Sequence, residues 1–287
     1  MATQTHQPGT LYLVATPIGN LEDITLRALR VLREVGLIAA EDTRHTRLLL
    51  ARHGIGARLL SYHAHSPAAR LQTILARLGR GESVALVSDA GTPGISDPGR
   101  KLVDACWQAG IQVVPVPGPS APIAALSLSG FPAGEFAFLG FLPRGHGERV
   151  RRLHAAAAAG RALIFFEAAS RLPQTLEALV EAVGDTLVLV ARELTKRFEE
   201  TVRGPASELA ARFRQSPARG EVTVVVEGKA PPPERSELEA EEIALAKARK
   251  LMAEGLSARS AAQQVAAERG MAFRAVYRRV LQEQSRR

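Results

Sequence analysis

Cysteine is nearly absent from this chain of 287 residues: the only one is Cys106, in an apolar stretch over residues 102–107. A single cysteine excludes an intrachain disulfide and a metal site built from clustered cysteines. His63 and His65 stand close together, but no further ligand clusters with them, so we interpret them as a loop pair and expect no metal.

Long apolar runs are also missing. No run reaches the ~18 residues that suggest a transmembrane helix. Residues 1–9 have neither the basic start nor the apolar core of a secretion signal, and we expect them to be disordered. These two absences predict a cytoplasmic protein with no membrane contact.

Acidic residues are fewer than basic ones, 29 against 37, which leaves a net charge of +8. Such an excess favours a polyanionic partner, because Lys and Arg neutralise phosphates and release counterions. A GC-rich genome gives the same Arg-rich composition, so the charge alone leaves both interpretations open.

The apolar pattern predicts an α/β protein of two domains with a helical appendage. Residues 10–140 are expected to form a mostly parallel, doubly wound sheet, with strands at 11–15, 37–40, 83–87, 112–116 and 136–139 and helices at 26–35 and 71–78. Residues 140–148 are rich in Gly, Pro and charge and indicate a linker. A second, mixed and partly antiparallel α/β domain is expected over 141–230, with strands at 162–166, 186–191, 199–203 and 221–226 and helices at 172–183 and 206–214.

Three consecutive prolines at 231–233 end the second domain. Three amphipathic segments follow, at 238–253, 261–268 and 273–283, and Gly255 and Gly270 stand where helix C-caps would put a glycine. Ser257 and Ser260 can each cap the second helix. The pattern over 231–287 resembles a helix-turn-helix bundle.

Ligands of doubly wound sheets lie beyond the carboxyl ends of the strands, so the loops there are the candidates for a site. The loop 16–25 follows the first strand; Gly19 allows close approach of a ligand, and Asp23 or Thr25 can cap the next helix. No G-x-G-x-x-G occurs, which argues against a dinucleotide site. A plain turn into a helix is the alternative.

The loop 88–99 is the most unusual, with three glycines, two prolines and two aspartates in twelve residues. Glycine permits close backbone contact with a ligand, and Asp89 and Asp97 can accept hydrogen bonds from an ammonium or ribose hydroxyl. Asp97 and Pro98 are equally well placed as the N-cap and first residue of a helix. Asp89 is therefore the better ligand candidate.

A third loop, 115–122, is a proline-rich turn into a helix whose N-terminus can bind a carboxylate through its free amides. Ser120 is either a ligand contact there or a plain N-cap.

These loops, with residues 41–44 after the second strand, resemble the 16S ribosomal RNA cytidine 2′-O-methyltransferases of the tetrapyrrole methylase superfamily. The resemblance runs over 11–228 and includes segments 166–172, 192–196 and 220–222. It implies S-adenosylmethionine held between the two domains, a homodimer, and methylation of a decoding-centre cytidine in 16S rRNA of the small ribosomal subunit. A superfamily Gly-Asp-Pro is replaced here by Gly91-Thr92-Pro93, so Asp89 is expected to take over the role of that aspartate.

The resemblance also implies a set of cofactor contacts. They are Ile18, Gly19, Asp89, Ala90, Gly91, Thr92, Pro93, Ile95, Ser120, Ala121, Phe166, Glu167, Ala168 and Leu194.

Catalysis on a ribose hydroxyl depends mainly on positioning, with added help from a general base. Asp42, Glu193 and Lys196 are the candidates for the base, and no motif selects one of them.

Substrate phosphates have candidate partners in Arg44 and Arg171, for which an ion pair within the protein is the alternative. Arg274 and Arg278, beside Tyr277 on the last expected helix, suit RNA backbone binding, although complementarity to the helix dipole explains them equally well. A tetrapyrrole methyltransferase and a non-catalytic RNA-binding assembly factor are the competing functions.

Overall fold

The computed structural model describes residues 7–95, 99–228 and 235–284. By its internal contacts the chain divides into a larger unit, residues 1–228, and a smaller unit, residues 229–287. Of the N-terminal segment expected to be disordered, residues 1–6 lie outside the described residues, whereas the Gly9 N–H donates a 2.7 Å hydrogen bond to Leu78 O.

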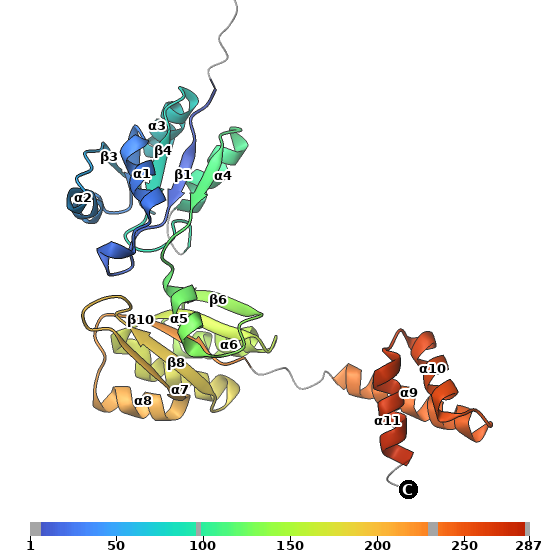
Figure 1. Cartoon of the computed structure of the whole chain (residues 1–287). Coiled ribbons are helices and arrows are strands. Elements are labelled where there is room, and N and C mark those ends of the chain that lie inside the picture. Colours follow the sequence, from blue (N-terminus) through green and yellow to red (C-terminus); the bar gives the residue numbers. More distant parts are fainter. Residues whose placement is uncertain (1–6, 96–98, 229–234, 285–287) are drawn as a thin grey trace, which may run out of the picture. The chain divides into compact units, whose positions relative to one another are not determined.

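The first sheet of the larger unit is parallel, with strand order β3-β2-β4-β1-β5 (Figure 1). Alternation along β2 sends Ile38 and Ala40 into one buried cluster and Leu37 and Ala39 into another, so both faces are covered by helices. The predicted doubly wound sheet is confirmed; β3 and α2 are additions to the prediction. The strands are β1 (Leu11–Val14), β2 (Leu37–Ala40), β3 (Leu59–Ser61), β4 (Val84–Val87) and β5 (Val113–Val116), and the helices are α1 (Leu26–Glu34), α2 (Thr43–Arg52), α3 (Ala68–Gly79) and α4 (Gly99–Gln108).

The second sheet is mixed, with strand order β6-β7-β10-β8-β9. β6 runs parallel to β7, and the other pairs are antiparallel, which confirms the predicted partly antiparallel sheet. Its strands are β6 (Phe136–Phe141), β7 (Ala162–Ala168), β8 (Leu187–Arg192), β9 (Glu200–Pro205) and β10 (Glu221–Val226), and the helices are α5 (Ala121–Ser129), α6 (His146–Ala157), α7 (Leu172–Val183) and α8 (Ala206–Gln215).

The strand predicted at 136–139 belongs to the second sheet and not to the first, because β6 pairs with β7. The prediction placed this strand in the wrong sheet because an apolar run shows that a strand is buried but not which sheet it joins. The linker predicted at 140–148 is also wrong: β6 reaches Phe141, and α6 starts at His146 with Gly145 as its N-cap. Glycine and acidic residues are common both in loops and at the start of a helix, so this composition did not distinguish a linker from the beginning of α6.

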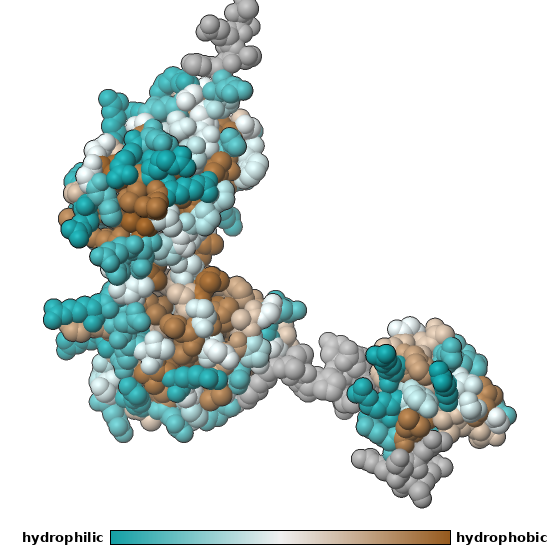
Figure 2. All heavy atoms as spheres, viewed as in Figure 1, coloured by the Kyte–Doolittle hydropathy of each residue, from teal (hydrophilic) through white to brown (hydrophobic). Residues whose placement is uncertain are grey.

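Helix α5 is apolar on nearly all sides. It buries Ala125 and Leu126 against one face of the second sheet and leaves Ile123 and Leu128 exposed. Figure 2 shows apolar side chains at the surface over the part of the larger unit that carries α5 and β6.

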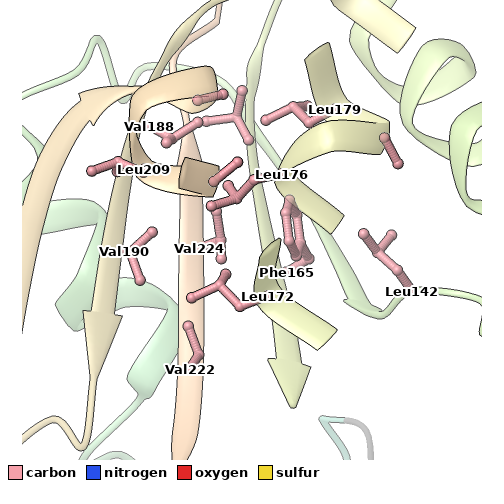
Figure 3. Packing of buried hydrophobic residues seen from close by; sticks show 14 of the residues in the cluster. Leu142, Phe165, Leu172, Leu176, Leu179, Val188, Val190, Leu209, Val222 and Val224 are labelled. Atoms are coloured by element: carbon pink, nitrogen blue, oxygen red, sulfur yellow. The ribbon is translucent and has the colours of Figure 1, made fainter. Parts of the chain in front are cut away.

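The opposite face of the second sheet carries its main core, formed with α6, α7 and α8 (Figure 3). Phe165 of β7 is fully buried there among side chains such as Leu172, Leu176 and Val224. Truncation of such a ring to alanine typically costs about 3–5 kcal/mol. The second sheet is thus a rigid support for the loops at its ends.

The smaller unit contains α9 (Arg235–Ala253), α10 (Ala258–Arg269) and α11 (Phe273–Gln284). Ser257, not Ser260, caps α10 by accepting a 3.1 Å hydrogen bond from the Ser260 N–H, and Gly270 ends the helix in the left-handed conformation, as predicted. No helix in the described part of the chain is long and apolar enough to cross a membrane.

Candidate functional site

A cavity of about 520 Å³ in the larger unit collects loops from both sheets. Its volume falls in the range of about 300–1,000 Å³ that is usual for small-molecule sites. Twelve of the predicted cofactor contacts line it: Ile18, Asp89, Ala90, Gly91, Thr92, Ile95, Ser120, Ala121, Phe166, Glu167, Ala168 and Leu194.

Two predicted cofactor contacts are not among the lining residues. Pro93 is buried beside the cavity. Gly19 packs against the turn after β8, where a Cβ would lie 2.4 Å from Lys196 Cγ. The absence of a side chain at Gly19 therefore serves loop packing. Ser96, Asp97 and Pro98 lie outside the described residues.

The first wall is held by backbone pairing between two loops. The Thr16 N–H donates to Gly91 O over 2.9 Å, and the Gly91 N–H donates to Thr16 O over 3.0 Å. Gly91 has φ +78°, in the left-handed region where a side chain is strained. The Thr16 hydroxyl also donates to Ser88 O over 3.1 Å. These bonds fix the start of the loop 88–99 against the loop after β1.

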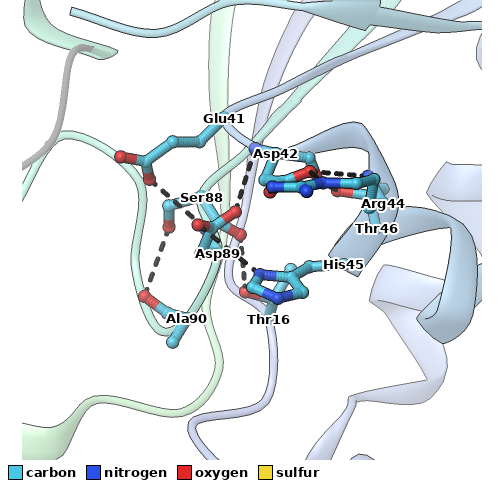
Figure 4. Close-up of polar contacts among 9 residues, drawn as sticks. All are labelled: Thr16, Glu41, Asp42, Arg44, His45, Thr46, Ser88, Asp89 and Ala90. Carbon is cyan, nitrogen blue, oxygen red and sulfur yellow. Dashed lines mark hydrogen bonds and ion pairs between the residues drawn. The ribbon is translucent and has the colours of Figure 1, made fainter.

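Asp89 is oriented by residues that follow β2 (Figure 4). The Asp42 N–H donates to Asp89 Oδ1 over 2.9 Å, and His45 Nδ1 lies 3.6 Å from Asp89 Oδ2. The Glu41 carboxylate accepts a 3.4 Å hydrogen bond from the Asp89 N–H. Glu41 and Asp89 both line the cavity, so two carboxylates are positioned at this wall.

The carboxylate of Asp42, a candidate general base, is engaged as a helix cap and in an ion pair. Its carboxylate caps α2 by accepting from the Arg44 N–H over 2.8 Å, and it also pairs with the Arg44 guanidinium over 2.6 Å. These bonds hold the pKa of Asp42 well below its ordinary value. It does not line the cavity. Arg44 is exposed, with Asp42 as its partner.

The opposite wall carries Glu193 and Lys196. Lys196 Nζ lies 3.1 Å from Glu193 Oε1 and 3.0 Å from Glu221 Oε2. The Glu221 N–H donates to Glu193 and, together with Lys196, lowers the pKa of the Glu193 carboxyl. Burial opposes the charge on Lys196, but hydrogen bonds to Glu221 and Glu193 outweigh it and raise the Lys196 pKa. Both side chains are therefore charged at neutral pH.

Glu167 is a buried carboxylate, 2% exposed, at the edge of the cavity. It accepts hydrogen bonds from the Thr175 hydroxyl (2.6 Å), the Ala168 N–H (2.8 Å) and Arg171 (3.3 Å). The Arg171 guanidinium also donates to Leu142 O and Pro143 O. Arg171 thus forms the internal ion pair that the sequence left open as the alternative to phosphate binding.

The N-caps of α1 and α5 settle which of the candidate residues Asp23, Thr25 and Ser120 caps a helix. Thr25, not Asp23, caps α1 by accepting from the Ala28 N–H over 3.0 Å. Ser120 takes the N-cap position of α5 but its side chain makes no capping hydrogen bond, and it lines the cavity. The Ser120 hydroxyl is therefore available to a ligand.

Arg274 and Arg278 are exposed one turn apart on α11 of the smaller unit. Among the described residues no group of three or more His, Cys, Asp or Glu could hold a metal ion. Cys106 is buried, and burial raises the pKa of its thiol to about 11.

Phe141 is the main lining residue that the sequence did not indicate. It lies in the segment 140–148, for which the sequence predicts a linker. The only available signal was its apolar character next to Gly140.

A family model, Tetrapyrrole (Corrin/Porphyrin) Methylases, matches residues 10–210. Two solved structures share the fold. A cobalt precorrin-4 methyltransferase is 19% identical with a TM-score of 0.59, over 79% of this chain and 97% of its own. A uroporphyrin-III C-methyltransferase from Thermus thermophilus, solved with S-adenosyl homocysteine, is 20% identical with a TM-score of 0.55, over 76% of this chain and 97% of its own. Fold and family model define the chain as a tetrapyrrole methylase-type protein.

More similar relatives narrow the class. Ribosomal RNA small subunit methyltransferase I of Thermotoga maritima is 50% identical over 221 residues, 77% of this chain and 99% of the relative. The protein of the same name from Mesorhizobium japonicum is 46% identical over 277 residues, 95% of this chain and 91% of the relative. The chain belongs to the ribosomal RNA small subunit methyltransferase I family.

Proposed function

We propose that this protein is an S-adenosylmethionine-dependent methyltransferase that methylates the ribose 2′-hydroxyl of a decoding-centre cytidine in 16S rRNA, in the cytoplasm. The observation that carries the proposal is the cavity of about 520 Å³, because the family-like loops of both sheets converge on it. The relatives, at 42–51% identity, are named for rRNA. The solved methyltransferases named for precorrin-4 and uroporphyrin-III are only 19–23% identical, so a tetrapyrrole substrate is less supported.

The cavity fits the chemistry of S-adenosylmethionine. Asp89 and Glu41 offer carboxylates to a ribose diol or an ammonium group, and the Ser120 hydroxyl is uncommitted by capping. Ile18 and Leu194 offer apolar surface to an adenine ring. When bound, the cofactor supplies an electrophilic methyl group on a cationic sulfonium.

None of the three candidate bases has a pKa shifted toward neutrality. The pKa of Asp42 and that of Glu193 are lowered, and that of Lys196 is raised. General base catalysis works best when the pKa lies near the working pH. We therefore assign the main catalytic contribution to orientation of the ribose in the cavity. Lys196, a cation at the cavity wall, is placed to orient a substrate phosphate.

The smaller unit is proposed to bind rRNA through α11. Arg274 and Arg278 share one exposed face, and Tyr277 stacks on Phe273 with ring centroids 5.4 Å apart. Cations of this kind bind the RNA backbone without reading its sequence. Deletion of residues 231–287 should weaken rRNA binding while the affinity for S-adenosylmethionine, measured by calorimetry, stays within about twofold.

A homodimer is proposed through the apolar surface of the larger unit. Ile123 and Leu128 of α5 and Phe136 of β6 are exposed. Apolar side chains gathered at a surface typically mark an interface. Light scattering on the wild type and on an Ile123→Glu/Leu128→Glu variant checks this: a dimer that becomes a monomer supports it, and a monomeric wild type contradicts it.

The decisive experiment incubates the protein with methyl-labelled S-adenosylmethionine and, separately, purified small subunits, naked 16S rRNA and a tetrapyrrole. We expect label in the rRNA, at one cytidine whose linkage resists alkaline hydrolysis because its 2′-oxygen is methylated. Label on a base, or only in the tetrapyrrole, would overturn the proposal. Cofactor binding without any transfer would favour an assembly factor.

A further inference from the structure

Strand β6 contains one extra residue next to the cavity. Phe138 pairs with Ile164 and Phe141 with Phe166, so three steps along β6 match two along β7. Gly140 lies within this irregularity at φ +64°. A residue inserted in this way is a β-bulge, a device that re-aims side chains beside active sites. In an unbroken ladder Gly140 would oppose Phe166, and Phe141 would point to the other face.

The bulge builds an aromatic wall from the rings of Phe138, Phe141 and Phe166. The centroid of Phe166 lies 5.1 Å from that of Phe138, edge to face, and 5.4 Å from that of Phe141. Phe166 and Phe141 line the cavity. Phe166 is half-buried, whereas Phe141 is 66% exposed. Phe141 therefore forms the outer end of the wall and presents its ring to whatever enters.

The backbone just after Phe141 is tied to a buried ion pair. The Arg171 guanidinium donates to Leu142 O over 3.2 Å and to Pro143 O over 3.0 Å, and Glu167 holds the same guanidinium. Leu142 is also buried in the core. Phe141 is thus an exposed ring on a fixed backbone, which lowers the entropic cost of a stacking contact.

From this geometry we infer that Phe141 is the platform on which the base of the target cytidine stacks while its ribose enters the cavity. The inference rests on the proposed function. Unpaired RNA bases are commonly recognised by stacking on an aromatic ring, and every base has a face to offer. Arg144, three residues further on, is exposed and forms no ion pair within the described residues, so it can meet the adjoining phosphate.

Two other groups could contact the ring of Phe141, the adenine of the cofactor and a second copy of the chain, and the experiments below distinguish them from the substrate base. The adenine of the cofactor would need an enclosed wall, and Phe166 with Leu194 supplies one deeper in the cavity. A second copy of the chain would cover Phe141 from outside together with Phe136. The position of Phe141 at the exposed end of the cavity favours the substrate base.

The first experiment compares Phe141→Ala, Phe141→Trp and Trp107→Ala with wild type, using small subunits as substrate. Trp107 is also 66% exposed but does not line the cavity, so it is the matched control. For Phe141→Ala we expect kcat/KM for rRNA to fall by roughly 10- to 100-fold, the range for one lost base stack. Its S-adenosylmethionine Kd and melting temperature should stay unchanged, and Phe141→Trp should retain activity.

Three results would overturn the inference. They are full activity of Phe141→Ala, loss of its cofactor affinity in place of rRNA affinity, and conversion of a dimer to a monomer. The second would assign the ring to adenine, and the third to another subunit.

A second experiment needs no methyl transfer, so it stays informative if the proposed reaction is wrong. Trp107 is the only tryptophan of the chain, so Trp107→Phe with Phe141→Trp leaves a single reporter in the wall. An RNA oligonucleotide with an unpaired cytidine should quench its fluorescence, and one with an abasic site there should not. Equal quenching by both would sink the stacking role. Quenching in this variant, together with a wild type that transfers no methyl, would refute only the proposed reaction.

Discussion

The Asn20 backbone N–H donates a 3.0 Å hydrogen bond to the hydroxyl of Thr195, a residue 175 positions away. Asn20 belongs to the loop after β1, and Thr195 to the turn after β8, so this bond joins loops that extend from the two sheets. Thr195 has φ +65° and Glu193 has φ +50°, both in a region that side chains avoid. Strain of about 1–3 kcal/mol per residue is typical of ligand clamps. The turn is therefore held in place by its partners.

Thr195→Val should loosen this clamp, because valine keeps the shape of threonine but cannot accept the hydrogen bond. We expect the Kd for S-adenosylmethionine to rise about 5- to 10-fold, in line with about 1 kcal/mol for a neutral hydrogen bond. Calorimetry measures the change. Thr73→Val is the control, since Thr73 is exposed and its hydroxyl donates to Ala69 O within α3. Equal affinities for both variants would show that the clamp does not act on the cofactor.

Asp89→Ala should weaken cofactor binding by about 10- to 150-fold, the cost of losing a hydrogen bond to a charged group. Asp89→Asn keeps an acceptor for the Asp42 N–H and should lose less. Titration calorimetry ranks the two variants beside Asp104→Ala, whose carboxylate bonds to Gln108 on α4. If Asp89→Ala binds as wild type does, the cofactor does not contact this wall.

The Glu193–Lys196 pair makes the stability of the fold depend on pH, in a direction that follows from the two pKa shifts. The folded-state pKa of Glu193 lies below its ordinary value near ~4.3, so its contribution to stability is present above that pH and is lost as the pH falls through the lowered pKa. Lys196 has a raised pKa, so its contribution is present below ~10.4 and is lost as the pH rises through the raised value.

Glu193→Gln should therefore destabilise the fold most at neutral pH. Its melting temperature, measured by calorimetry across pH, should converge on that of wild type as the pH falls through the lowered pKa of Glu193. Glu34→Gln is the control, because Glu34 pairs with Arg30 only at the exposed surface. A difference between Glu193→Gln and wild type that stays constant as the pH falls from neutral through the acid range would contradict the assignment.

Gly140→Ala tests the bulge of β6. A side chain at φ +64° costs about 1–2 kcal/mol, so the free energy of unfolding should fall by that amount, while Gly140→Asn should lose less. Denaturant titration measures it. Gly134 has space for a Cβ and no positive φ, so Gly134→Ala should be close to neutral. Equal stability of the two alanine variants would mean that the bulge is not strained.

Much of the site could be predicted because buried parallel strands are recognisable in a sequence as short apolar runs. The carboxyl ends of these strands lie at one edge of the sheet, so the loops that follow them come together there. The loop 88–99 was recognisable by glycine and proline alone. The wall containing Phe141 was not, because it depends on a bulge and on the sheet that β6 joins, and neither is encoded in an apolar run.

The sequence indicated two pairs of opposite charges but could not assign a role to either pair. Asp42 stands before a helix and Arg44 follows two residues later, a spacing that suits a cap as well as a base. Glu167 and Arg171 are four residues apart, which favours an ion pair, yet only packing shows that this pair is buried.

The smaller unit has a core of unusually small side chains. Its buried apolar residues among those described are alanines and valines: Ala244, Ala248, Ala261, Ala262, Val265, Ala266, Val276 and Val280. Each alanine removes far less apolar surface from water than a leucine, so these helices gain little free energy per residue on packing. On heating, this unit should melt before the larger one. A polyanion that binds across its helices would raise that early transition and leave the later one where it was.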